Sequence, residues 1–176
     1  MKQTPLYSIV IFPNPEQIAL IKSYKQLLKD NIGWFGSANS DAHITLINFE
    51  NEFLFELYIN QIRMFCNTII SKKVIFKTLD SFGNTTFYLA PDRDSQLYLD
   101  KIIIDLHKYL NFKINNVNSH LTIARGLNEE KMKIAFELFC NFEFNFEFTC
   151  DAMYLRKFNV QTKQYSDVLE KINFKY

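Results

Sequence analysis

The chain has 176 residues, which is enough for one domain or for two small lobes that share a core. Twenty basic and 19 acidic residues give a formal net charge of +1. A balance so close to zero argues against a protein that wraps duplex nucleic acid by bulk charge. The sequence also lacks the two glycine-rich phosphate-binding patterns, G-x-x-x-x-G-K and G-x-G-x-x-G.

The cysteines and the apolar segments indicate the cellular compartment of the protein. Cys66, Cys140 and Cys150 have no C-x-x-C spacing, and an odd number without a metal pattern is typical of reduced thiols in the cytosol. The apolar stretch 7–12 is closed by Pro13 and is too short to span a membrane. We therefore expect a cytoplasmic protein without a membrane segment.

Apolar periodicity and capping residues predict a mixed series of strands and helices. In chain order it comprises a strand at 9–12, a helix capped by Asn14, a loop at 33–41, a strand at 43–49, a helix capped by Asn51, a hairpin of 73–79 and 85–90, a helix beginning at Pro91, a strand at 119–124 and a helix capped by Asn128.

Three further elements are expected to complete the chain. Phenylalanine alternates with polar residues over 142–149, which predicts a half-buried strand. The segment 152–158 is expected to be extended, and 165–174 is expected to be partly helical around 166–170. The second half repeats the first in kind: a helix, a strand beginning with histidine, a helix and two strands. We therefore expect one α+β domain over 1–176, with two similar lobes at about 1–91 and 92–176 that share strands.

Two nearly identical tetrads carry the candidate chemistry. The sequences His43-Ile-Thr-Leu and His120-Leu-Thr-Ile lie 77 positions apart, and the chain has only three histidines. Residues i and i+2 of a strand share a face, so His43 projects with Thr45, and His120 projects with Thr122. If the lobes face each other, two imidazoles and two hydroxyls line one cleft.

This set of groups suits phosphodiester chemistry. A neutral imidazole can take a proton from a nucleophile, and an imidazolium can give one to the departing oxygen, because the ordinary histidine pKa is about 6.5. Threonine hydroxyls can donate hydrogen bonds to the phosphate oxygens as negative charge builds up there. No cluster of residues at metal-ligand spacing is present in the sequence.

The paired His-x-Thr motifs resemble the 2H phosphoesterase superfamily, in particular its 2′–5′ RNA ligase-like (LigT-like) members. The resemblance covers 6–174 and includes 120–125 and an ending like 153–156. It implies a bilobal α+β fold with pseudo-twofold symmetry around a central cleft. It also implies metal-independent chemistry on 2′,3′-cyclic phosphates or 2′–5′ linkages. By this resemblance His43 and His120 are the acid–base pair, and Thr45 and Thr122 bind the phosphate.

Three further residues are candidates for substrate binding. Family members often carry an arginine shortly after the second motif, as Arg125 stands here. Strand alternation places Arg125 opposite His120, so it reaches the cleft only where the strand ends or bulges; the alternative is a surface ion pair. Trp34 and Phe35 precede the first motif and could stack on a base, or they could form a hydrophobic cap on the loop.

Other polar and aromatic residues have simpler explanations. His107 lies in a predicted helix without a threonine partner and is expected to be structural or at the surface. Asp92 and Asp94 stand at a helix start, where capping explains them. Tyr7 and Tyr154, on predicted strands, are weaker candidates for base stacking.

The sequence thus predicts an enzyme, a cyclic phosphodiesterase or 2′–5′ RNA ligase-like phosphoesterase, that needs no metal or cofactor. Its expected partner is a nucleotide or RNA terminus with a cyclic phosphate or a 2′–5′ linkage, and a monomer is expected. Two alternatives remain open: a non-catalytic nucleotide- or RNA-binding module, and a phosphodiesterase for a non-RNA metabolite such as a cyclic phosphate of ADP-ribose. The motifs leave open which histidine is the acid and which is the base.

Overall fold

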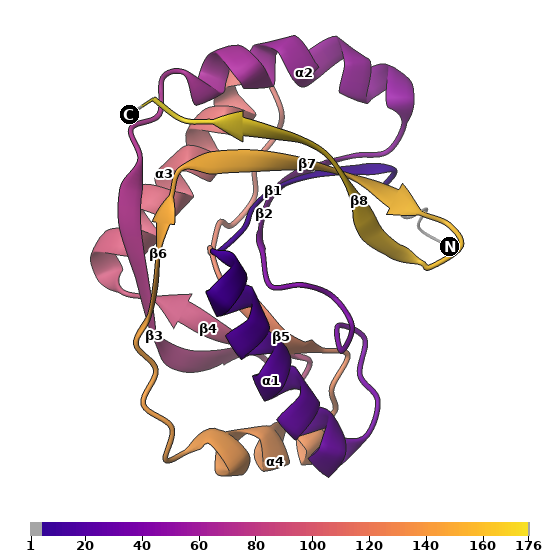
Figure 1. Ribbon diagram of the computed structural model, residues 1–176, viewed down its shortest axis with the longest axis vertical. Coiled ribbons are helices and arrows are strands. Elements are labelled where there is room, and N and C mark those ends of the chain that lie inside the picture. The colour runs from indigo at the N-terminus through magenta and orange to yellow at the C-terminus, as the bar shows by residue number, and fades with distance from the viewer. Residues whose placement is uncertain (1–4, 176) are drawn as a thin grey trace.

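A computed structural model describes residues 5–175 (Figure 1). Strands and helices alternate along most of this part of the chain. In order, the elements are β1 (Tyr7–Ile11), α1 (Pro15–Ile32), β2 (Ile44–Phe49), α2 (Glu52–Cys66), β3 (Lys72–Phe82), β4 (Thr86–Pro91), α3 (Arg93–Tyr109), β5 (Leu121–Arg125), α4 (Glu129–Phe139), β6 (Phe146–Cys150), β7 (Ala152–Asn159) and β8 (Gln164–Asn173).

The strands form two antiparallel sheets of four strands each. The strand orders are β2-β1-β7-β8 and β5-β4-β3-β6. Each sheet takes two strands from each half of the chain. The strands that follow the two histidines, β2 and β5, occupy the same edge position in their sheets. This confirms the expected α+β fold of two related lobes, and it places the two motifs in equivalent positions.

Side-chain caps begin all four helices of the described chain, as the sequence predicted. Asn14, Asn51 and Asn128 each accept a hydrogen bond from a backbone N–H in the first turn, at 2.9–3.0 Å. The Asp92 carboxylate does the same for Ser95 at 2.9 Å, which lowers the Asp92 pKa. These bonds satisfy backbone donors that a helix leaves free at its N-terminus.

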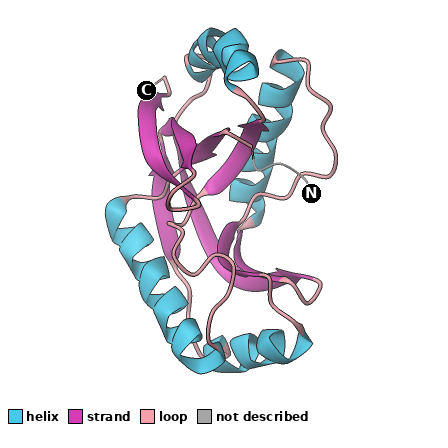
Figure 2. Cartoon of the chain, turned by 90° about the vertical axis from the view of Figure 1, so that its right-hand side faces the viewer, coloured by secondary structure: helices cyan, strands magenta, loops and turns pink. Residues whose placement is uncertain are grey.

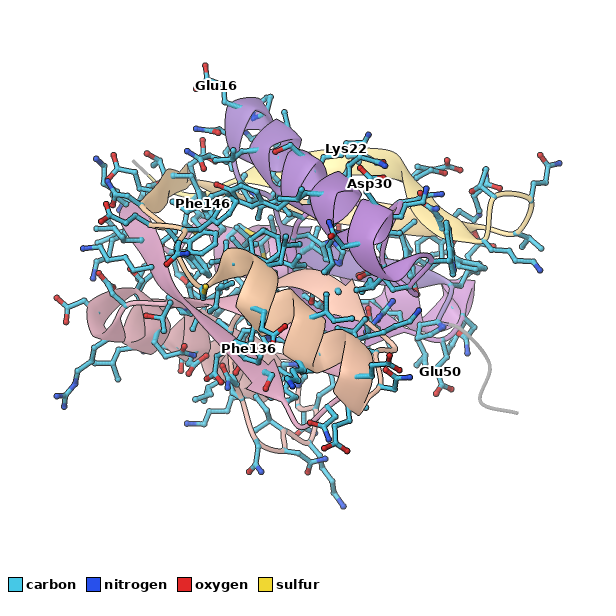
Figure 3. The ribbon with its side chains drawn as sticks, turned by 90° about the horizontal axis from the view of Figure 1, so that it is seen from below. Glu16, Lys22, Asp30, Glu50, Phe136 and Phe146 are labelled. Atoms are coloured by element: carbon cyan, nitrogen blue, oxygen red, sulfur yellow. The ribbon has the colours of Figure 1, made fainter. Side chains whose placement is uncertain are left out.

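The helices surround the strands and cover their outer faces (Figure 2). Helix α2 packs against β2 and β8, and α3 contacts β2 as well as β3 and β4. Helix α1 packs against β5, β6 and α4, and Figure 3 shows α1 beside α4, with Lys22 and Asp30 on α1 and Phe136 on α4. The two sheets and four helices thus share one core. No helix within residues 5–175 has the length and apolar character to cross a membrane.

The strand expected over 142–149 is shorter than its alternating pattern predicts. Strand β6 begins only at Phe146, whose partner on β3 is Phe76. Upstream, Phe142 and Phe144 lie in a loop and pack around Tyr24 of α1, with ring centroids 5.9 and 5.6 Å from it. Packing of these rings against Tyr24 replaces the pairing that a longer strand would have made.

The prediction of a helical turn at 166–170 is wrong. These residues belong to β8, which pairs with β7 over most of its length. Strand β8 lies at the edge of its sheet and is largely exposed on both faces, so it lacks the apolar alternation that marks a strand. Pairing with β7 overrides the weak local preference for a helix.

Candidate active site

A cleft of about 1260 Å³ is lined by both motifs. His43 and Thr45 reach it from the start of β2, and His120 and Thr122 reach it from the start of β5. The structure therefore brings together the four residues that the sequence analysis selected as the acid–base and phosphate-binding groups.

Both imidazoles are held in the same way. Nδ1 of His43 lies 2.6 Å from the carbonyl of Asp41, and Nδ1 of His120 lies 2.8 Å from the carbonyl of Asn118. A carbonyl oxygen only accepts, so each Nδ1 carries the proton. Nε2 of each ring has no hydrogen bond within residues 5–175 and is free to exchange a proton with a molecule in the cleft.

A β-bulge follows each motif at the equivalent residue. Leu46 is the extra residue of β2, and Ile123 is the extra residue of β5. A bulge reverses the alternation of side chains beyond it. As a result Asn48 and Arg125 face the same cleft as the motif histidines and threonines. The condition for Arg125 to reach the cleft is thus met.

Side chains from elsewhere in the chain satisfy the backbone at both bulges. Nε2 of His107, on α3, lies 2.9 Å from the Leu46 carbonyl and donates to it. The Ser37 hydroxyl, in the loop before the first motif, lies 3.3 Å from the Ile123 carbonyl. His107 therefore has a structural role, and the backbone carbonyl at each bulge has a side-chain hydrogen-bond partner.

The loop before His43 is also anchored to α1 and to β5. The buried Nζ of Lys25 donates to the carbonyls of Ser37 and Ser40 at 3.0 and 2.6 Å, and burial lowers the pKa of Lys25 to about 8. The Gly36 N–H donates to the Arg125 carbonyl at 2.8 Å. A Cβ at position 36 would lie only 3.2 Å from that oxygen, so a glycine permits the close approach.

The segment before His120 has an anchor of its own on α3. The Asp100 carboxylate accepts hydrogen bonds from the Ser119 N–H, at 2.9 Å, and from the Ser119 hydroxyl. Gln96 donates to the other oxygen of Asp100 at 2.7 Å. Each histidine thus follows a segment that is tied to the helix preceding its motif strand.

Arg156 is a site residue that the sequence analysis did not select. It lies on β7, lines the cleft and is only 4% exposed. Its guanidinium carbon lies 5.4 Å from the ring centroid of Phe12 and 5.2 Å from that of Tyr165. Its Nη1 is 3.5 Å from His43 Nδ1. Because that nitrogen already donates to Asp41, the approach places a positive charge beside the ring without adding a hydrogen bond.

The two histidines differ in their surroundings. Burial and then the charge of Arg156 lower the pKa of His43 to about 3, and Lys25 and Arg125 act in the same direction. Burial lowers the pKa of His120, and its hydrogen bond to Asn118 opposes this effect. The rings of Phe82 and Tyr88 lie 5.0 and 4.9 Å from the His120 ring. Positive charge therefore disfavours protonation of His43 more than protonation of His120.

The aromatic candidates separate into one cleft residue and three others. Trp34 is 60% exposed and lines the cleft, so its stacking role stays a prediction. The expected role of Phe35 does not fit, because this side chain is 2% exposed and packs in the core. Tyr7 is buried, stacks on Phe55 and donates to Glu52, while Tyr154 packs on Phe12; neither tyrosine lines the cleft.

No group of three histidine, cysteine, aspartate or glutamate side chains within residues 5–175 is arranged to hold a metal ion. Cys66 and Cys150 are buried free thiols, and burial raises the pKa of each to about 12. Such thiols are poor nucleophiles. The histidines, threonines and arginines of the cleft are therefore the candidates for chemistry, and activity without a metal stays a prediction.

Comparison with known proteins agrees with this geometry. The family model of the 2′-5′ RNA ligase superfamily matches residues 13–162. No curated protein sequence matches the chain significantly. Among solved structures, E. coli LigT complexed with 3′-AMP has a TM-score of 0.67 at 13% identity, with 98% of this chain and 99% of that chain covered. TT0787 of Thermus thermophilus has a TM-score of 0.65 at 14% identity, with 97% and 98% covered.

A third solved structure, described as a phosphoesterase, has a TM-score of 0.63 at 14% identity and covers 98% of this chain and 99% of its own. At these identities the structural likeness shows the fold, which is that of the LigT-like 2H phosphoesterases. The family match covers most of the chain and includes both His-x-Thr motifs. The chain therefore belongs to the 2′-5′ RNA ligase superfamily.

Proposed function

We propose that this protein is a metal-independent phosphoesterase that acts on 2′,3′-cyclic phosphates or 2′–5′ phosphodiesters of nucleotides or RNA ends. One observation carries the proposal: two imidazoles with the same fixed tautomer line one cleft, each with a threonine two residues later. Nucleotide binding alone needs no such pair of proton-transfer groups.

The difference between the two histidines supports an assignment of roles in hydrolysis. His43, beside Arg156, stays neutral and acts as the base, taking a proton from water through Nε2. His120, farther from positive charge, is protonated when a phosphate anion binds, and its Nε2–H gives that proton to the departing ribose oxygen. A new P–O bond to the water oxygen forms as the bond to the ribose oxygen breaks. Thr45 and Thr122 donate to the non-bridging oxygens.

The solved neighbours support a nucleotide as the substrate. E. coli LigT was solved in complex with 3′-AMP, with ATP and with NADP+. The cleft of about 1260 Å³ offers room for a nucleotide, and Trp34 provides an exposed ring on its wall. Reversal of the same proton transfers would join two ends, so ligation at this site is a reaction of the same machinery.

The test is hydrolysis of a panel of 2′,3′-cyclic mononucleotides, 2′–5′ oligoadenylate and RNA with a terminal cyclic phosphate. We expect His43→Ala and His120→Ala each to lower kcat by about 10²–10⁴. The double variant should lose less than the product of the two, because both groups act in one transition state. Thr45→Val and Thr122→Val should cost about 10- to 1000-fold. His107→Ala is the matched control, because the third histidine does not line the cleft.

Two outcomes would change the proposal. Full activity in either motif-histidine variant, with the fold intact by circular dichroism, would contradict the shared site and favour the non-catalytic binding module. Hydrolysis confined to a cyclic phosphate of ADP-ribose would instead identify a phosphodiesterase for a non-RNA metabolite. The same two histidines would then act on a different substrate.

A further inference from the structure

Arg156 is a buried cation that forms no ion pair within the described part of the chain. Its side chain lines the cleft at 4% exposure, yet no carboxylate within residues 5–175 forms an ion pair with it. The guanidinium reaches only the Ser8 hydroxyl, at 3.4 Å, and the edge of the His43 ring, and its Nε has no partner within the described residues. Burial of a charge costs free energy unless the charge is paired, so a negatively charged ligand would stabilise this guanidinium.

The surroundings of Arg156 are built to hold an anion. Its guanidinium carbon lies within cation–π distance of the rings of Phe12 and Tyr165, at 5.4 and 5.2 Å from their centroids, and these contacts restrict where the guanidinium can lie. Arg125 adds a second positive charge, which acts to lower the pKa of both His43 and Tyr165. Among residues 5–175, Asp41 is the carboxylate whose charge raises the pKa of Arg156, and it makes no ion pair with the guanidinium.

The position of this cation differs from that of the scissile phosphate. In the proposed mechanism the reacting phosphate lies between the free Nε2 atoms of His43 and His120, near the two threonines that also line the cleft. Arg156 instead lies at the Nδ1 edge of the His43 ring, away from Nε2. An anion that pairs with Arg156 is therefore displaced from the reacting centre and lies toward Tyr165 and the end of the β7–β8 hairpin.

We propose that Arg156, which lies next to the rings of Phe12 and Tyr165, binds a second, non-reacting phosphate of the substrate. The inference rests on the proposed function and narrows its substrate class. The preferred substrate is a nucleotide that carries a 5′-phosphate in addition to the 2′,3′-cyclic phosphate, with the sugar between them. Such a ligand satisfies the two-histidine centre and the unpaired guanidinium at the same time. Arginine forms strong, charge-assisted hydrogen bonds to phosphate groups.

The test is isothermal titration with two ligands that undergo no reaction, adenosine 3′,5′-bisphosphate and adenosine 3′-phosphate. The wild-type protein should bind the bisphosphate about 10- to 100-fold more tightly. Arg156→Met should abolish this preference and leave the affinity for the monophosphate within about twofold. Lys157→Met is the matched control, because the adjacent cation on β7 approaches Glu52 and the Tyr7 ring, outside the cleft. It should keep the full preference.

Arg156→Lys tests the inference if the methionine variant does not fold. Lysine retains the positive charge but lacks the planar guanidinium. The ratio of the affinity for the bisphosphate to that for the monophosphate should therefore fall but remain above one. Equal binding of the two ligands by wild-type protein would overturn the inference. So would an equal loss for both ligands in Arg156→Met, since that would assign Arg156 to the reacting phosphate. A protein that prefers the bisphosphate but hydrolyses no cyclic phosphate would support this subsite and refute the proposed function alone.

Discussion

The close approach of Arg156 to His43 predicts that removal of this cation changes the titration of one histidine and not the other. In Arg156→Met, the positive charge 3.5 Å from His43 Nδ1 is lost, so protonation of that ring becomes easier and its pKa rises. His120 should keep its pKa, because burial and the Asn118 carbonyl, and no neighbouring cation, determine it.

The size of the change follows from the geometry. Two unit charges 4 Å apart interact by about 4 kcal/mol at an effective dielectric constant of about 20. At about 1.4 kcal/mol for each pKa unit, this corresponds to roughly three units. The guanidinium charge is spread over several atoms and the cleft admits water, so we expect a rise of about one to three units from the wild-type value of about 3.

Two measurements follow this change. Proton NMR of the imidazole Cε1–H groups resolves the titration of each of the three histidines. The kinetic counterpart is kcat/KM, which falls as the pH drops through the pKa of the base, so the acid limb of Arg156→Met should move to higher pH by the same amount. An unchanged His43 midpoint, or an equal rise at His120, would refute the assignment of His43 as the base kept neutral by Arg156.

Two other changes test the structural role of His107 and the expected independence from metal. His107→Ala leaves the Leu46 carbonyl without its donor, so the free energy of unfolding measured in urea should fall by about 1–3 kcal/mol. The kcat/KM of this variant should stay within about twofold of wild type. An unchanged free energy of unfolding would contradict the structural role. Hydrolysis of cyclic phosphates should survive dialysis against EDTA, and a loss that one divalent ion restores would show that a metal takes part.

Local sequence signals predicted the helix starts and the motif strands well. Asparagine caps are read within a few residues, and the bonds of Asn14, Asn51 and Asn128 to their first turns match that expectation. The tetrads identify their own strands, because histidine and threonine share one face while the aliphatic residues share the other. The two copies predicted one shared cleft on the condition that the lobes face each other, and in the structure both motifs line one cleft.

Features that depend on pairing between distant segments were harder to predict. The bulges at Leu46 and Ile123 exist only because β2 and β5 each accommodate one extra residue against a neighbouring strand. Strand β8 has no alternating pattern because both of its faces are largely exposed. Arg156 carried one usable signal, a charged residue in a strand beside apolar Leu155. Its partners Phe12 and Tyr165, however, lie on segments that only the fold brings together.

The repeat within the chain explains why the site has two histidines, and the proposed mechanism needs one of them neutral and the other protonated. Equal imidazoles in equal surroundings would have equal pKa values, and at most about a quarter of the molecules would then hold the required arrangement. The chain breaks the equivalence with residues outside the tetrads. Arg125 stands after the second motif at the position where Asn48 stands after the first. The charge of Arg125 nevertheless acts to lower the pKa of His43, the histidine of the first motif. Arg156 adds to it from β7. In the proposed mechanism, this inequality between the halves lets two identical side chains take opposite roles.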